Sequence, residues 1–241
     1  MSKKPWKPDL VLLFCGAQVA CFFLGMLLVN MLHRSGVTGF KGEEDFGTVA
    51  LATLSFQGVT WVMIPFFSMA HEVDWREVLG LRGGNIPRSI RLAIVTLVVV
   101  LPAALALEAA CEWSMKALGW QPRPQEAVQL LNDTPFWPTG VYIGFFAIVL
   151  APVAEEFIFR GVLFSFIKQA GYPRLAWIGA STLFALVHGA SVIFIPLFVL
   201  ALALTWLYEK TDNLLASIIA HSLFNTINLV IYYMGGQQAA P

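Results

Sequence analysis

Charged residues are scarce in this sequence. Asp, Glu, Lys and Arg make up 12% of its 241 residues, whereas soluble domains usually contain about 25%. Hydrophobic residues make up 58%, and the mean hydropathy is +0.71. We therefore expect lipid, rather than water, to surround most of the surface. The formal net charge is +0 and no basic tract is present, which leaves no electrostatic basis for binding nucleic acid.

Cysteine is also rare, and its pattern excludes two kinds of site. The three cysteines are Cys15, Cys21 and Cys111. An odd number of cysteines without a C-x-x-C spacing fits neither a disulfide framework nor a structural zinc site. We predict that all three are small apolar packing residues.

The N-terminus carries a basic flank ahead of a long apolar run at residues 10–32. A cleaved signal peptide would have an apolar region of only about 7–15 residues, ended by a small-residue cleavage site. A lipoprotein-type cysteine at Cys21 is a second alternative, which Gln18 three positions earlier does not favour. We expect the run to be a retained membrane helix.

A helix that spans a bilayer needs about 20 predominantly apolar residues. Seven stretches reach or approach this length, at residues 10–32, 48–69, 90–111, 139–168, 175–189, 191–208 and 214–234. The fourth is longer than a perpendicular span requires, and Pro152 is expected to kink it. The sequence therefore predicts an all-α fold, a polytopic transmembrane helical bundle of about seven to eight helices. We expect one membrane domain over residues 1–241.

Positive charge is unevenly distributed among the connections. Lys and Arg cluster before the first stretch, between the second and third, between the fourth and fifth, and between the sixth and seventh. Because such clusters favour the cytoplasmic side, we predict a protein integral to the cell (inner) membrane with a cytoplasmic N-terminus. Seven spans would place the C-terminus outside, and an eighth, re-entrant helix would change that side.

Ionisable and amide side chains recur within three of the apolar stretches. Each ionisable group at the bilayer centre costs about 2.5–3.5 kcal/mol on insertion scales, so such residues commonly mark functional sites. They are Glu155, Glu156 and Arg160 in the fourth stretch, His188 in the fifth, and His221 and Asn225 in the seventh. By contrast, Glu108, near the outer end of the third stretch, is interpreted as an interfacial carboxylate.

Helical geometry indicates which of these side chains can act together. Glu156 and Arg160 are four residues apart and can form an ion pair on one face. Glu155 is rotated by about 100° from Glu156, because 3.6 residues make a turn, and can face a cavity. His221 and Asn225 are also four residues apart and project side by side. Arg160 would keep Glu156 ionised and leave Glu155 free.

The chemistry that this set suits is the activation of water. Glu155 would act as a general base on a water that attacks an amide carbonyl. His221 and Asn225 would donate hydrogen bonds to the oxyanion that forms, which supplies a large part of the rate enhancement in many enzymes. His188 would hold the water or ligate a metal.

Each motif has a simpler interpretation when it is taken alone. A Glu–Arg pair in a membrane helix is more often structural, and a single buried histidine is usually a packing residue. Two other functions therefore stay open: a proton- or ion-coupled transporter with Glu155, Glu156 and His221 as relay groups, and a catalytically silent membrane scaffold. The three motifs together favour hydrolysis, because Asn225 beside His221 suits an oxyanion better than a proton relay.

These motifs, in this order, resemble the signature of the CPBP family of intramembrane proteases. The residues that carry the resemblance are Glu155-Glu156-x-x-x-Arg160, Phe184-x-x-x-His188 and His221-x-x-x-Asn225, within residues 151–228. The family includes the type II CAAX prenyl proteases and bacteriocin-processing or immunity-related membrane proteins. The resemblance implies a membrane endopeptidase, a hydrolase, with its catalytic core at residues 139–234 and a cavity open to the cytoplasmic leaflet.

The resemblance also implies roles and partners. The implied roles are water activation for Glu155, support of that base for Glu156 and Arg160, water positioning for His188, and oxyanion binding for His221 and Asn225. The expected partners are a peptide or protein substrate and membrane lipid, with no nucleic acid. Eukaryotic relatives cut after a prenylated cysteine, whereas a bacterial chain would instead process a secreted peptide or protect against a bacteriocin.

The family is named as one of metalloproteases, yet a metal-free, glutamate-dependent mechanism is also argued for relatives. His188, His221 and one glutamate could supply the three protein ligands of a catalytic zinc. The sequence contains no His-Glu-x-x-His helix, however, which is the common zinc-protease motif. A divalent metal such as zinc therefore stays an open alternative, and no other cofactor is expected.

Overall fold

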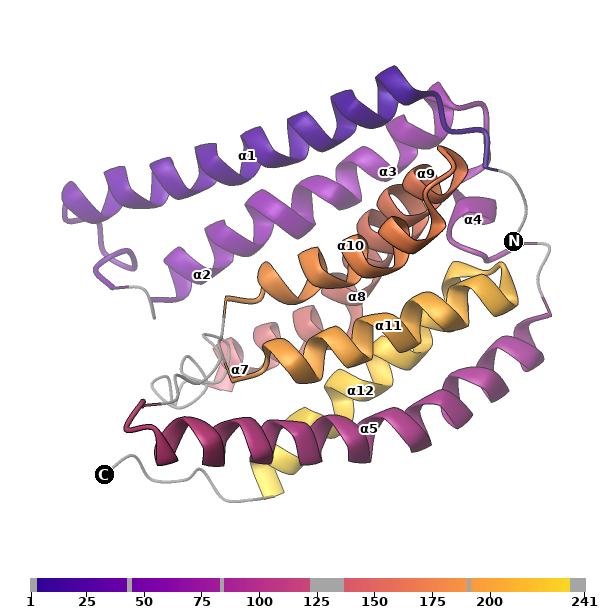
Figure 1. The fold of residues 1–241 in the computed structure, drawn as a ribbon. Helices are drawn as coiled ribbons and strands as arrows, with labels where there is room; N and C mark the ends of the chain where they lie inside the picture. The colour runs from indigo at the N-terminus through magenta and orange to yellow at the C-terminus, as the bar shows by residue number, and fades with distance from the viewer. Residues whose placement is uncertain (1–3, 43–44, 83–84, 122–136, 190–191, 235–241) are drawn as a thin grey trace.

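The computed structural model describes residues 4–42, 45–82, 85–121, 137–189 and 192–234. Throughout these ranges the regular elements are helices (Figure 1). Six of them are long and apolar enough to cross a membrane: Pro8–Arg34, Phe46–Ala70, Ile86–Ala117, Gly140–Gln169, Phe194–Thr211 and Leu214–Met234. The predicted all-α membrane bundle is confirmed.

The first half of the bundle contains three of these spans. Helix α1 (Pro8–Arg34) is followed by a continuous helix made of α2 (Phe46–Thr53), the π-helical turn η1 (Leu54–Gly58) and α3 (Val59–Ala70). The short helix α4 (Trp75–Val78) leads to α5 (Ile86–Ala117). Helix α1 packs on α2, η1 and α3, and 22% of its apolar window is buried, so most of it faces outward.

The second half begins with a segmented helix. This helix consists of α7 (Trp137–Phe145), the π-helical turn η2 (Phe146–Leu150), α8 (Ala151–Glu156), the π-helical turn η3 (Phe157–Phe164) and α9 (Ser165–Gln169). It is followed by α10 (Pro173–Leu186), α11 (Phe194–Thr211) and α12 (Leu214–Met234). The span Gly140–Gln169 is 50% buried, more than any other candidate span, which makes it the centre of the bundle.

The fifth predicted stretch is shorter than a full span. Helix α10 has 14 residues, about 21 Å at 1.5 Å per residue. Its first residue is Pro173, and the chain turns at Gly189, whose φ of +69° is a left-handed conformation that glycine adopts without strain. The apolar residues after α10 therefore form a turn, which hydropathy alone did not distinguish from helix.

Pro152 lies in the first turn of α8, directly after η2. Proline has no N–H to donate, and a π-helical turn already interrupts the normal hydrogen-bond ladder at this point. Two carbonyls of η2 instead accept bonds from other helices: Leu150 O from Trp61 Nε1 at 2.9 Å, and Ala147 O from Asn225 Nδ2 at 2.8 Å. The irregular turn therefore joins α3, α8 and α12.

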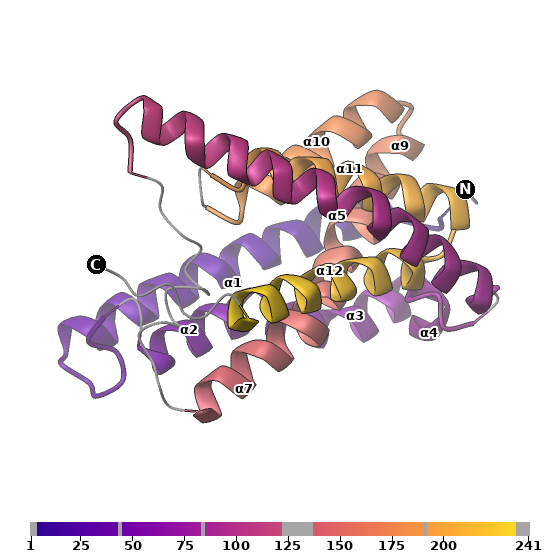
Figure 2. The same ribbon diagram turned by 90° about the horizontal axis from the view of Figure 1, so that it is seen from below.

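The six candidate spans and helix α10 alternate in direction along the bundle (Figures 1 and 2). At one end lie the start of α1, helix α4, the α9–α10 turn and the α11–α12 turn; we call this the N-terminal end. At the distal end lie the α1–α2 connection, the end of α5, the start of α11 and the end of α12. The start of α1 and the end of α12 are thus at opposite ends.

Candidate active site

A buried ion pair lies at the junction of α8 and η3. Arg160 Nη1 is 2.7 Å from Glu156 Oε1, and the two side chains are 1% and 0% exposed. Arg160 Nη2 also donates to the carbonyl of Ala201 on α11 at 3.1 Å. The predicted i,i+4 pair therefore forms, and it also holds α11 against the segmented helix.

His221 on α12 joins this pair. Its Nδ1 is 3.0 Å from Glu156 Oε1, so one carboxylate oxygen accepts bonds from both Arg160 and His221. An ionised carboxylate can only accept a hydrogen bond, so Nδ1 of His221 is the donor. The Nε2 atom lies at the other side of the ring and faces away from Glu156. Glu156 therefore fixes the orientation of His221.

Glu155 lies one residue earlier and faces the opposite edge of that imidazole. Its Oε2 is 3.7 Å from His188 Nε2 and 3.9 Å from His221 Nε2. Its Oε1 accepts a hydrogen bond of 3.2 Å from Gln57 Nε2 on η1. The carboxylate is 7% exposed, so it lies almost buried between two imidazoles and an amide.

His188 follows the last turn of α10. Its Nδ1 is 2.7 Å from the carbonyl of Phe184, which can only accept, so Nδ1 donates and Nε2 faces Glu155. The Phe184 ring lies 4.7 Å from the His188 ring and 5.6 Å from the His221 ring. The guanidinium of Arg160 lies 4.6 Å from the same phenyl ring. Phe184 thus packs among three site residues.

Four of the predicted site residues line one cavity of about 590 Å³: Glu155, His188, His221 and Asn225. The walls come from α2 and η1, α5, α7, η2 and α8, the residues that follow α10, and α11 and α12. Glu156 and Arg160 lie behind this lining. The structure therefore brings all six predicted residues together but divides them into four that face the cavity and two that support them.

Asn225 has one of its two amide hydrogens bound to Ala147 O, at 2.8 Å. A carboxamide nitrogen has a second hydrogen to donate. Because Asn225 also lines the cavity, the side chain can hold η2 and still present a donor to a bound group. This is compatible with the predicted oxyanion role, which stays a prediction.

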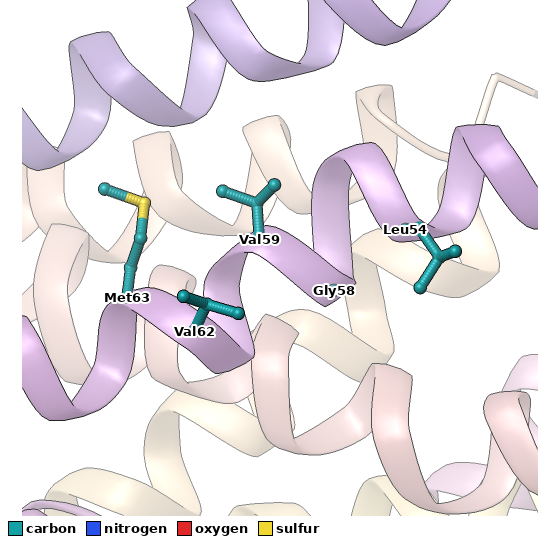
Figure 3. Close-up of a pocket in the computed structure, with 5 residues that line it drawn as sticks. All are labelled: Leu54, Gly58, Val59, Val62 and Met63. Carbon is teal, nitrogen blue, oxygen red and sulfur yellow. The ribbon is translucent and has the colours of Figure 1, made fainter.

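A second hollow, of about 350 Å³, lies along η1 and α3 (Figure 3). It is lined by Leu54, Gly58, Val59, Val62 and Met63. Leu54 and Val62 are 54% and 62% exposed. This surface has no ionisable side chain, so it suits contact with lipid rather than chemistry.

The described residues include no group of three His, Cys, Asp or Glu side chains that could hold a metal ion. Glu155, His188 and His221 nevertheless face one another, with Glu155 Oε2 at 3.7 and 3.9 Å from the two Nε2 atoms. The second nitrogen of each imidazole is directed at a protein acceptor, Phe184 O or Glu156 Oε1. A histidine that ligates a metal usually donates its other N–H to such an acceptor, so these bonds do not decide between the zinc alternative and a metal-free mechanism.

Two residues of the site were not predicted from the sequence. Gln57 is an amide in an apolar stretch, and that signal could have marked it. Gln18 gives the same signal, however, but its Nε2 donates to the Phe56 carbonyl and serves packing. Glu108, interpreted as interfacial, also lines the cavity. Residue type alone therefore does not distinguish a glutamine or glutamate that lines the cavity from one that serves packing or lies at the membrane interface.

The region that contains the site is similar to a known protein family. Residues 136–227 match the family described as "Type II CAAX prenyl endopeptidase Rce1-like". All six predicted site residues lie within the match. The family resemblance expected from the motifs is confirmed, and the protein is an integral membrane protein with a Rce1-like region.

Two relatives from Lactococcus lactis subsp. lactis (strain IL1403) are similar over part of the chain. The UPF0177 protein YxdF is 37% identical over 78 residues, which cover 32% of this chain and 42% of the relative. The UPF0177 protein YaiF is 37% identical over 83 residues, 34% of this chain and 37% of the relative. The chain thus spans about two fifths of the length of these curated relatives. No solved structure matches it.

Proposed function

We propose that this Rce1-like membrane protein is an endopeptidase that hydrolyses a peptide bond of a membrane-associated peptide or protein with a water activated by Glu155. The observation that carries this proposal is the position of Glu155 Oε2, which faces the Nε2 atoms of His188 and His221 inside one cavity. The family supports membrane protease activity in general. The geometry supports the specific mechanism.

The site has the dimensions to hold a water molecule. Two hydrogen bonds of about 2.8 Å can meet at one oxygen when their outer atoms are less than about 5.6 Å apart. The separations of Glu155 Oε2 from His188 Nε2 and from His221 Nε2 are 3.7 and 3.9 Å. A single water can therefore contact the carboxylate and an imidazole at once.

The proposed reaction balances with these groups alone. Glu155 takes a proton from the water, and the hydroxide oxygen forms a bond to the carbonyl carbon of the substrate. The carbonyl oxygen becomes an oxyanion, to which Asn225 donates its second N–H. The C–N bond then breaks, the proton passes from Glu155 to the departing amine, and the carboxylate is restored.

The remaining residues position these groups. Glu156 and Arg160 fix the tautomer and orientation of His221, and the Phe184 carbonyl does the same for His188. With both Nε2 atoms turned toward Glu155, the imidazoles hold the water against the base. Gln57 holds the other oxygen of that base, so Glu155 is fixed from both sides.

Two features of the substrate follow as parts of the proposal. The cavity is lined by apolar and aromatic side chains around a few polar groups, which suits a hydrophobic peptide segment. The family description names a prenyl endopeptidase, so a prenylated peptide and an unprenylated secreted peptide are both candidates. We propose further that the chain resides in the inner membrane with a cytoplasmic N-terminus.

The test is a cleavage assay on purified protein in nanodiscs. Libraries of hydrophobic peptides, with and without a prenylated cysteine, are incubated with the protein and analysed by mass spectrometry. We expect one set to be cut at a defined bond, and Glu155→Gln to abolish the products. Glu108→Gln is the matched control, because Glu108 lines the same cavity without a histidine beside it.

The assay separates the proposal from its alternatives. Cleavage that persists in Glu155→Gln contradicts the mechanism, and no cleavage of any peptide contradicts the function. Proton flux in proteoliposomes that Glu155→Gln changes, without any peptide cut, would instead support a transporter.

A further inference from the structure

The cavity occupies only one half of the bundle. Along α12 its lining runs from His221 to Tyr232, toward the end of the helix, and α10 contributes nothing before its C-terminal turn, where Val187 and His188 lie. On α5 the lining residues are Ala104, Leu105 and Glu108, in the second half of the helix. Each of these helices runs toward the distal end (Figures 1 and 2).

The helices that run in the opposite direction line the cavity in the same half of the bundle. On α2 and η1 the lining ends at Gln57, and on α11 it ends at Leu197, only four residues into the helix. These helices begin at the distal end. The cavity therefore extends from Glu155 toward the distal end, not toward the N-terminal end.

The opposite side of Glu155 is closed by packed side chains. The large residues there are 0–1% exposed: Phe157, Phe164, Leu204, Leu207 and Leu214. The ion pair of Glu156 and Arg160 lies among them and is equally buried. A peptide could not reach Glu155 from the N-terminal end without opening this core.

Positive charge assigns the two ends to the two sides of a membrane. Among the described residues outside the core, nine Lys and Arg lie at or near the N-terminal end and three at the distal end. The three are Arg34, Lys41 and Lys116. Since cytoplasmic connections carry the excess of Lys and Arg, the N-terminal end is cytoplasmic.

We infer that the catalytic cavity is reached from the non-cytoplasmic side of the membrane. A cytoplasmic N-terminus and a distal cavity do not agree with the cavity open to the cytoplasmic leaflet that the family resemblance implies, and the labelling experiment below decides between the two. The inference rests on the proposed function, under which the substrate is then a peptide segment already exposed on, or inserted from, the outer side. The reaction that supplies this substrate is therefore export or membrane insertion of a peptide.

Single cysteines test this inference in intact cells. Cys15, Cys21 and Cys111 are first replaced by alanine. Asn228→Cys then places a thiol in the cavity, whose lining includes Asn228. Two matched controls report the ends of the bundle: Ser35→Cys at the exposed end of α1, and Arg82→Cys beyond α4, where the side chain is 62% exposed.

A membrane-impermeant maleimide is added before or after permeabilisation. We expect Asn228→Cys and Ser35→Cys to be labelled in intact cells to a similar extent, and Arg82→Cys only after permeabilisation. If Asn228→Cys, like Arg82→Cys, is labelled only after permeabilisation, the inference is overturned. Labelling of Arg82→Cys in intact cells would overturn it as well. A cysteine at position 228 that reacts from neither side would contradict a water-filled cavity.

The result of the labelling experiment does not depend on whether the proposed function is correct. The labelling experiment measures only access to the cavity and needs no substrate. The cleavage assay in nanodiscs, where both faces are exposed, measures hydrolysis regardless of orientation. A negative result in one of the two experiments therefore does not affect the interpretation of the other.

Discussion

Gln57 donates a hydrogen bond of 3.2 Å from its Nε2 to Oε1 of Glu155. The two residues are separated by 98 positions in the chain, and Gln57 lies outside the region that matches the Rce1-like family. The N-terminal helices therefore contribute to the site rather than only supporting it. This bond fixes the carboxylate so that its second oxygen faces the two imidazoles.

Replacement of Gln57 by leucine is expected to slow peptide cleavage. A hydrogen bond to a charged group contributes about 1.5–3 kcal/mol, which corresponds to a fall of about 10- to 100-fold in kcat. KM should change little, because Gln57 acts through Glu155. The measurement is steady-state cleavage together with its pH profile, which should shift because the environment of the base has changed.

Gln18→Leu is the matched control for this substitution. Gln18 is a buried glutamine that, like Gln57, bonds across helices, in its case to the carbonyl of Phe56, but it does not line the cavity. We expect it to lower thermal stability and leave kcat and the pH profile unchanged. Equal effects of the two substitutions on kcat would show that Gln57 is only structural.

Substitution of Arg160 is expected to destabilise the protein strongly. Arg160→Met leaves Glu156 buried without its ion-pair partner, and breaking a buried pair in this way typically costs about 3–5 kcal/mol. Thermal unfolding in detergent measures the loss. Arg82→Met, which removes an exposed partner of Asp74, should change stability by no more than about 1 kcal/mol. Similar shifts for both variants would contradict the structural role of the buried pair.

Substitution of Asn225 is expected to affect the reaction more than the fold. Loss of one oxyanion donor typically lowers kcat by about 10²–10³-fold, so Asn225→Ala should show this fall with a nearly unchanged KM. Trp61→Phe provides the control, because it removes the bond to the neighbouring carbonyl of η2 without altering the cavity lining. If Trp61→Phe lowers kcat as much as Asn225→Ala, the role of Asn225 is to hold η2.

Chelators are expected to leave cleavage unchanged. In the proposed mechanism the base is the carboxylate of Glu155, which acts on water directly. The purified protein is assayed with EDTA and with 1,10-phenanthroline, and its metal content is measured by mass spectrometry. Inhibition that stoichiometric zinc reverses would favour the metal alternative over a carboxylate acting directly on water.

Much of the architecture follows from hydropathy, and the rest depends on turns that hydropathy does not detect. Each of the six candidate spans overlaps one of the predicted apolar stretches, because the cost of burying polar groups in lipid leaves a strong signal in sequence. The end of α10 and the π-helical turns were not predicted, because backbone irregularities within apolar runs leave little compositional trace.

The site was predictable where its residues share a helix. The spacing of Glu156 and Arg160 predicts their ion pair, and the structure confirms it. Contacts between distant segments, such as Gln57 with Glu155, depend on how helices pack. The direction in which the cavity opens depends on packing as well, and the sequence motifs do not specify it.

The most direct test of the account compares cleavage by the wild type and by Glu155→Gln under single-turnover conditions. Glutamine preserves the size of the side chain and keeps one oxygen that can accept the bond from Gln57, but it cannot take a proton from water. We predict that peptide binding persists while the rate of bond cleavage falls by at least about 10²–10⁴-fold, the usual contribution of a general base. A rate within a few fold of the wild type, with the peptide bound equally well, would contradict it.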